Sequence, residues 1–145
     1  MAIVAVCAIG LAAAGLSRVR VFSREERLYP GAARNLGIRV TSAPYVAFLA
    51  ADCSAGRGWA AGRLAAHRAG AAAVASAVVN AYPDSNAAWA GNLLLHSRLH
   101  ESTPPARRLR YLLSYDRTLF DRYGYFREDL RASEDTELKI GRAHV

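Results

Sequence analysis

An aspartate at the end of an apolar run is the first residue placed to do chemistry. Residues 45–49 form a compact apolar segment bounded by Pro44 and followed closely by Asp52. In open α/β sheets, ligands bind at the carboxyl ends of strands. A carboxylate there can hold a divalent cation that neutralises a diphosphate. The alternative is an ordinary turn or capping aspartate, which the residue taken by itself favours.

A pair of adjacent carboxylates far along the chain is the second candidate. Glu134 and Asp135 follow Ser133, which we expect to cap a last helix from its N-terminal end. Two neighbouring carboxylates can divide the work of acid–base catalysis, because one takes a proton while the other orients it. The alternative is that both acids only stabilise the first turn of the helix.

Three further patterns carry less chemistry. His96 and His100 have the spacing of two metal ligands on one helix face, but Ser97 stands where the zinc-protease pattern needs glutamate. The glycines between residues 56 and 62 resemble a dinucleotide fingerprint whose last glycine comes one residue late. Cys7 and Cys53 are far apart, so we expect no disulfide and a reducing, cytoplasmic compartment.

Alternating strand-like and helix-like segments must position these residues, and they predict a single α/β domain. The helix expected from Pro30 to Val40 places Ala32, Ala33 and Leu36 on one face with Val40. The other strands and helices are expected from similar local patterns. The strands are residues 19–22, 45–49, 74–79 and 109–115, and the remaining helices are 58–70, 88–100, 116–123 and the one after residue 133.

Composition excludes some function classes. The 145 residues carry a net charge of +7, and all but one of the 19 basic residues are arginine, the exception being Lys139. The arginines are scattered among acids and the chain is rich in alanine, which is typical of a GC-rich coding sequence. We therefore expect no nucleic-acid partner, since a basic stripe is lacking.

The first sixteen residues are uncharged and almost wholly apolar. They are shorter than the roughly 20 residues that a bilayer requires, and no basic residues precede them as in a signal peptide. A buried strand and helix is the favoured interpretation. A misplaced start codon and a membrane anchor are the alternatives, so residues 1–18 are treated as a segment of uncertain origin.

The order of four motifs resembles that of family-2 glycosyltransferases. Residues 30–38 (PGAARNLGI) are similar to the family's G-x-A-R-N-x-G-I stretch, and residues 45–53 (YVAFLAADC) to its F-L-D-x-D segment. Trp59 matches the G-W opening of the next helix. Residues 114–126 resemble S-x-R-x-x-F-x-x-x-G-x-F, and residues 134–138 (EDTEL) resemble E-D-T-E-L. The resemblance covers about residues 19–139.

The resemblance implies a nucleotide-diphospho-sugar transferase fold of the GT-A type, with a central mixed sheet flanked by helices. It implies inverting transfer of a sugar from a nucleotide-diphosphate donor to a carbohydrate or lipid-linked acceptor, with Mg²⁺ or Mn²⁺ as the cation. The roles carried over by position are Asp135 as general base, Glu134 as its catalytic neighbour, Arg34, Asn35 and Asp52 at the donor, Asp52 also at the metal, and Ser114, Tyr115 and Arg117 on the acceptor side.

Departures from the family pattern keep two other functions open. Ala50 replaces the first aspartate of D-x-D, and the family's opening nucleotide-binding strands have no recognisable counterpart. We therefore interpret the sequence as a glycosyltransferase domain truncated at both ends and expect the truncated chain to be inactive by itself. Residues 140–145 (IGRAHV) are what one frame of a common sequencing adapter encodes and are interpreted as read-through. The alternatives are a catalytically inactive binding module and a membrane-associated structural protein, with peripheral contact at the inner membrane face.

Overall fold

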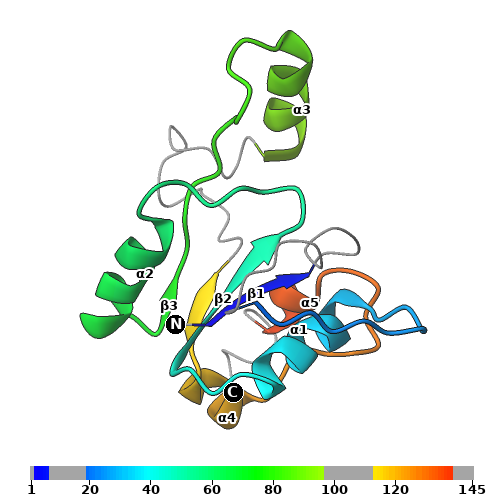
Figure 1. Cartoon of the computed structure of the whole chain (residues 1–145), viewed down its shortest axis with the longest axis vertical. Coiled ribbons are helices and arrows are strands. Elements are labelled where there is room, and N and C mark those ends of the chain that lie inside the picture. Colours follow the sequence, from blue (N-terminus) through cyan, green and yellow to red (C-terminus); the bar gives the residue numbers. More distant parts are fainter. Residues whose placement is uncertain (1, 7–18, 97–112, 139–145) are drawn as a thin grey trace.

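The computed structural model describes residues 2–6, 19–96 and 113–138 (Figure 1). Its strands are β1 (Ala2–Val6), β2 (Tyr45–Ala50), β3 (Ala73–Val74) and β4 (Ser114–Asp116). Its helices are α1 (Pro30–Arg39), α2 (Trp59–Arg68), α3 (Asn86–His96), α4 (Thr118–Tyr123) and α5 (Glu134–Thr136). Strands and helices alternate through most of this order, as the sequence predicted.

The four strands form one mixed sheet in the order β1-β2-β4-β3. β1 runs parallel to β2, whereas β4 is antiparallel to both β2 and β3. A mixed sheet with flanking helices confirms the expected α/β class. β1 lies inside the apolar segment that was set apart from the domain, and the structure includes this part of it in the sheet.

Helices cover the sheet from several directions (Figure 1). α1 packs beside β1 and contacts α5, and α2 packs against β3 at the other edge. α4 follows β4 directly and lies below the sheet in this view, while α3 extends away from it. α1 and α5 are therefore neighbours although Arg34 on α1 and Glu134 on α5 are 100 positions apart in the sequence.

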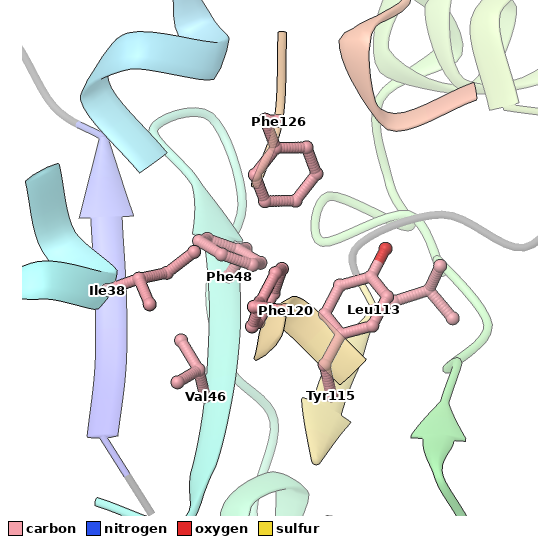
Figure 2. Packing of buried hydrophobic residues seen from close by; sticks show 7 residues of the cluster. All are labelled: Ile38, Val46, Phe48, Leu113, Tyr115, Phe120 and Phe126. Carbon is pink, nitrogen blue, oxygen red and sulfur yellow. The ribbon is translucent and has the colours of Figure 1, made fainter. Parts of the chain in front are cut away.

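The hydrophobic core lies between β2, β4 and the helices α1 and α4 (Figure 2). Its buried members are Ile38, Val46, Phe48, Leu113, Tyr115, Phe120 and Phe126. The rings of Phe48 and Phe126 meet edge to face with centroids 5.4 Å apart. Such aromatic pairs add stability beyond the apolar area that they bury. The same rings form one wall of the candidate site described below.

Residues on β2 and β4 alternate between the two faces of the sheet, as in any strand. Val46 pairs with Tyr115, and Ala47 pairs with Ser114. Tyr115 therefore shares the α1 face with Val46 and Phe48, whereas Ser114 faces α2. Val46, Ala47 and Phe48 are all buried, so both faces of β2 are covered.

Several sequence expectations need correction. Residues 19–22 form no strand but an exposed extended segment, and the strand expected at 74–79 is only Ala73–Val74. The buried face of α1 comprises Gly31, Asn35 and Ile38 and not the alanine face predicted from hydrophobicity. Buried polar contacts decide that orientation, as the site shows.

The cap of α5 also differs from the prediction. Ser133 has a left-handed backbone with a φ of 65° and makes no side-chain capping hydrogen bond. Cys7, His100, most of the strand expected at 109–115 and the adapter-like residues 140–145 lie outside the described residues.

In the part of the chain that the structure describes, no helix is long and apolar enough to cross a membrane.

Candidate active site

The first structural feature of the site is one face of α1. Gly31, Arg34, Asn35 and Ile38 are spaced so that they lie on the same side of the helix. Helix formation begins with proline at its first turn, where the missing N–H costs no hydrogen bond. These four residues are also fixed positions of the G-x-A-R-N-x-G-I motif. The motif therefore describes a packing face that meets residues from the far end of the chain.

Asn35 joins this face to the segment after α4. Its side-chain Nδ2 donates to the carbonyl of Phe126 at 2.8 Å and to Oε1 of Glu128 at 2.8 Å. Its Oδ1 accepts from the backbone N–H of Phe126 at 3.0 Å. The side chain is buried with its hydrogen-bonding atoms engaged, and a direct contact between Asn35 and a donor stays a prediction that this geometry does not favour.

Arg34 joins the same face to α5. Its Nη1 donates to Oε1 of Glu134, and the two side chains are only 14% and 5% exposed. The guanidinium carbon lies 5.6 Å from the ring centroid of Phe48 and 5.4 Å from that of Phe126. A predicted donor-site residue and a predicted catalytic residue thus meet in a largely buried, aromatic environment.

Asp135 comes next after Glu134 and is half-buried. Its charge contributes to the environment of Tyr115 on β4: burial first, and then the negative charge of Asp135, raise the pKa of the Tyr115 hydroxyl. α5 therefore brings both carboxylates toward the buried ends of β2 and β4.

Asp52 lies two residues beyond the end of β2 and is exposed. Its Oδ1 accepts a hydrogen bond from the thiol of Cys53 at 3.6 Å. Burial and the adjacent Asp52 charge raise the pKa of that thiol, so a neutral S–H remains available to donate. β2 also carries Phe48, whose ring contacts Arg34. Because Arg34 pairs with Glu134, it links α5 to the strand that ends near Asp52. The convergence of Asp52 and Asp135 on one pocket stays a prediction.

The three residues predicted for the acceptor side occupy different environments. Ser114 and Tyr115 are buried on opposite faces of β4. Arg117 donates from Nε to Ala43 O at 2.7 Å, from Nη1 to Ile38 O at 2.9 Å and from Nη2 to Thr41 Oγ1 at 2.9 Å. Arg117 therefore fastens the C-terminal end of α1 and the loop before β2 to the junction between β4 and α4. Their acceptor roles stay predictions, which the burial of Ser114 and Tyr115 disfavours.

Ser114 has a partner that the sequence did not indicate. Nε2 of His67 lies 2.8 Å from its hydroxyl, while Nδ1 of His67 lies 2.6 Å from the carbonyl oxygen of Ala71. A carbonyl only accepts, so Nδ1 carries the proton and, in the neutral ring, Nε2 accepts from Ser114. Tyr45 stacks on the same ring with centroids 4.7 Å apart. This arrangement fastens α2 to the sheet and is closed to substrate.

The described residues offer limited metal coordination. Among residues 2–6, 19–96 and 113–138, no group of three or more His, Cys, Asp or Glu side chains forms a ligand cluster. Mg²⁺ commonly takes one or two carboxylates and completes its shell with water and substrate phosphates. The exposed carboxylate of Asp52 fits that limited requirement.

Comparison with known proteins decides the family. The model of glycosyl transferase family 2 matches residues 9–128, which is most of the chain. The chain belongs to this family. The matched range includes Arg34, Asn35 and Asp52 of the expected donor side, and it ends before Glu134 and Asp135. Comparisons with curated proteins and with solved structures give no significant match.

Membership in glycosyl transferase family 2 accounts for residues that composition alone did not explain. The motif face of α1 contacts Phe48 and Phe126 and is joined to α5 through Arg34. Glu128 accepts a hydrogen bond from the Asn35 side chain, and no sequence pattern had indicated it. His67 was likewise missed, because nothing in its local sequence points to a partner 47 residues away.

Proposed function

We propose that this family-2 glycosyltransferase chain transfers a sugar from a nucleotide-diphosphate sugar to an acceptor hydroxyl with inversion at the anomeric carbon. The observation that carries the proposal is the Arg34–Glu134 ion pair, because it joins the family motif of α1 to the carboxylate pair of α5. Without that contact, only their order in the sequence would connect the two motifs.

The chemistry assigned to the chain's own residues is a single displacement. The carboxylate of Asp135 accepts the proton of the acceptor hydroxyl as that oxygen attacks the anomeric carbon. The new carbon–oxygen bond forms on one face of the sugar. The bond from the anomeric carbon to the diphosphate breaks on the other face and leaves its electron pair on the nucleoside diphosphate. Attack opposite the leaving group inverts the anomeric centre.

Asp52 is the residue that would hold a divalent cation at the donor diphosphate. A bound cation would supply charge neutralisation for the departing diphosphate. Because Ala50 stands in the first position of the D-x-D pattern, Asp52 alone provides the carboxylate of that motif. The affinity for the cation should therefore depend strongly on the phosphates of the donor.

The test combines turnover and binding on the full 145-residue chain. Release of nucleoside diphosphate is measured with a panel of nucleotide sugars and simple sugar acceptors in the presence of Mn²⁺ or Mg²⁺. Turnover that falls at least a hundredfold in Asp135→Asn, and that requires Asp52, supports the proposal. Asp84→Asn is the matched control, because Asp84 is an exposed carboxylate in the loop before α3.

A second function is favoured by one observation, the alanine at position 50. A glycosyltransferase-like module that binds a nucleotide sugar without transferring it would retain nucleotide affinity and show no turnover. Calorimetry with UDP or GDP and Mn²⁺ distinguishes the two functions. Binding that Asp52→Asn abolishes, together with turnover no higher than in Asp135→Asn, would identify the binding module.

A further inference from the structure

The guanidinium of Arg34 is already engaged by other side chains of the protein. It lies over the rings of both Phe48 and Phe126, and 14% of the Arg34 side chain is exposed. The rings stabilise the cation through their negative faces. Nη1 is engaged by Glu134, so contact of this nitrogen with a donor diphosphate would require it to leave its carboxylate partner.

Glu134 is in turn unlike a carboxylate that exchanges protons with a substrate. Its side chain is 5% exposed, and Oε1 is engaged by Arg34. Removing one partner of a buried ion pair leaves an uncompensated charge, which is strongly unfavourable. Glu134 and Arg34 are therefore dependent on each other, and their pairing is a fixed part of the fold.

The turn that carries Asp135 has little support of its own. α5 spans Glu134–Thr136, with helical backbone continuing through residue 138, and its N-cap Ser133 makes no side-chain capping bond. Its backbone hydrogen bonds include those from the N–H groups of Thr136 and Glu137 to the carbonyl of Ser133, at 3.1 and 3.0 Å, and one from the C-terminal cap to the carbonyl of Glu134. An isolated turn of this length is unstable in water, so contacts outside the turn must hold it in place.

We propose that Arg34 is a positioning residue of the transferase site, which holds Glu134 and thereby fixes the first turn of α5 and the direction of the Asp135 carboxylate. This inference rests on the proposed function of Asp135. It changes the roles that the family resemblance gave to two residues: Arg34 acts through Glu134 and not on the donor, and Glu134 is an anchor and not a proton carrier. Glu134 thereby connects α1 to Asp135.

The first experiment follows amide exchange in α5 by hydrogen–deuterium exchange of the full chain. Arg34→Met keeps an aliphatic side chain at this position and removes the charge. We expect exchange at the Thr136 and Glu137 amides to accelerate at least tenfold, with Phe48 on β2 nearly unchanged. Glu134→Gln keeps an oxygen that accepts from Arg34 but leaves the guanidinium charge uncompensated, so we expect an acceleration smaller than that of Arg34→Met. If Arg34→Met does not fold, Arg34→Lys replaces it with the same expected direction.

Arg39→Met is the matched control for exchange. Arg39 lies on the same helix and pairs with Glu128 at 3.1 Å, but its side chain is 55% exposed. Its removal should leave α5 exchange unchanged. Exchange in Arg34→Met within twofold of the wild type would overturn the inference.

The second experiment separates positioning from donor binding. In Arg34→Met we expect the Kd for UDP or GDP with Mn²⁺ to change less than threefold, while kcat falls at least thirtyfold at nearly constant KM. Loss of nucleotide binding with unchanged α5 exchange would show that Arg34 is a donor ligand and would overturn the inference.

The pH profile tests the role of Glu134. Glu134→Gln should retain the acid limb of kcat/KM, because Asp135 still accepts the proton, and loss of that limb would overturn the anchor role. If the wild-type chain shows neither turnover nor nucleotide binding, the proposed function fails. The exchange measurement then decides by itself whether Arg34 fixes the turn.

Discussion

Asn35 and Phe126 lie 91 positions apart and are joined by two hydrogen bonds of opposite direction, with the side chain of Asn35 donating to the carbonyl of Phe126 and accepting from its N–H. An asparagine side chain here takes the place of a neighbouring strand, since it satisfies both backbone groups of one residue. Few side chains can do this, because the group must carry a donor and an acceptor in one plane.

Replacing Asn35 by alanine should leave both backbone groups of Phe126 buried without this partner. We expect a loss of about 2–4 kcal/mol in the free energy of unfolding, because each unsatisfied buried group costs about 1–3 kcal/mol. Urea denaturation followed by circular dichroism measures it. Asn86→Ala, at an exposed position of α3, should change stability little. Equal stability of the two variants would contradict the role assigned to Asn35.

Gly31 is required for the close approach of α1 to the segment after α4. A Cβ atom at Gly31 would overlap the carbonyl oxygen of Arg127. Alanine normally stabilises a helix by about 1 kcal/mol relative to glycine, but overpacking costs about 1–3 kcal/mol and a backbone carbonyl cannot easily move. We therefore expect Gly31→Ala to lower the free energy of unfolding, as measured by urea denaturation.

Gly62 on α2 provides the opposite case. A Cβ atom there meets nothing within 4 Å. Gly62→Ala should raise stability by about 0.5–1 kcal/mol through the helix preference of alanine alone. The prediction is wrong if the two glycine variants shift stability in the same direction.

Arg117 should be irreplaceable by lysine because its three nitrogen atoms bind three different acceptors. A lysine keeps the charge but cannot reproduce the planar fork. Arg117→Lys should lower stability by about 1–2 kcal/mol, as expected for lost hydrogen bonds. Arg131→Lys, at an exposed position, should be neutral in the same thermal or urea melts. If Arg117 serves the acceptor instead, the variant would lose turnover with unchanged stability.

Tyr115 makes stability dependent on alkaline pH. Burial, followed by the charge of Asp135, raises the pKa of its hydroxyl above the ordinary value of 10.0. The unfolded chain then releases this proton first, so the folded state binds more protons above pH 10.0. Its stabilising contribution is complete below that pH and decreases as pH rises toward the folded pKa, at up to about 1.4 kcal/mol per pH unit.

Comparison of the wild type with Tyr115→Phe isolates this effect. Urea melts from pH 8 to pH 11 should show a stability difference that is constant at the lower values and moves in favour of the phenylalanine variant at the upper ones. A difference that stays constant across the whole range would show that Tyr115 ionises equally in both states.

Local signals in the sequence predicted elements well where the pattern was strong. Pro30 and the periodicity after it indicated α1, and the apolar run at 45–49 indicated β2. The buried face of α1 was predicted wrongly because hydrophobicity favours alanine and leucine, whereas this face is held by polar contacts of Arg34 and Asn35. Those contacts involve residues about one hundred positions away, and no local pattern reports them.

The candidate site shows the same division. The resemblance identified Arg34, Asn35, Asp52, Glu134 and Asp135 as residues that matter, and the structure brings Arg34 to Glu134. Which of them bind and which support could not be read from the motif, because burial depends on tertiary packing. The expected strand at residues 19–22 failed for a related reason: its valines have strand propensity, but no neighbouring strand pairs with them in the described part of the chain.

The dependence of α1 on the far end of the chain has a consequence for how the protein is made. During synthesis α1 leaves the ribosome long before the residues around Phe126 and Glu134 exist, so Arg34 and Asn35 must wait in water without their final partners. Contacts between residues so distant in sequence slow folding, because a long loop must close before they form. We therefore expect nascent chains that stop short of residue 126 to be sensitive to protease and to bind chaperones, and protection to arise in one late step.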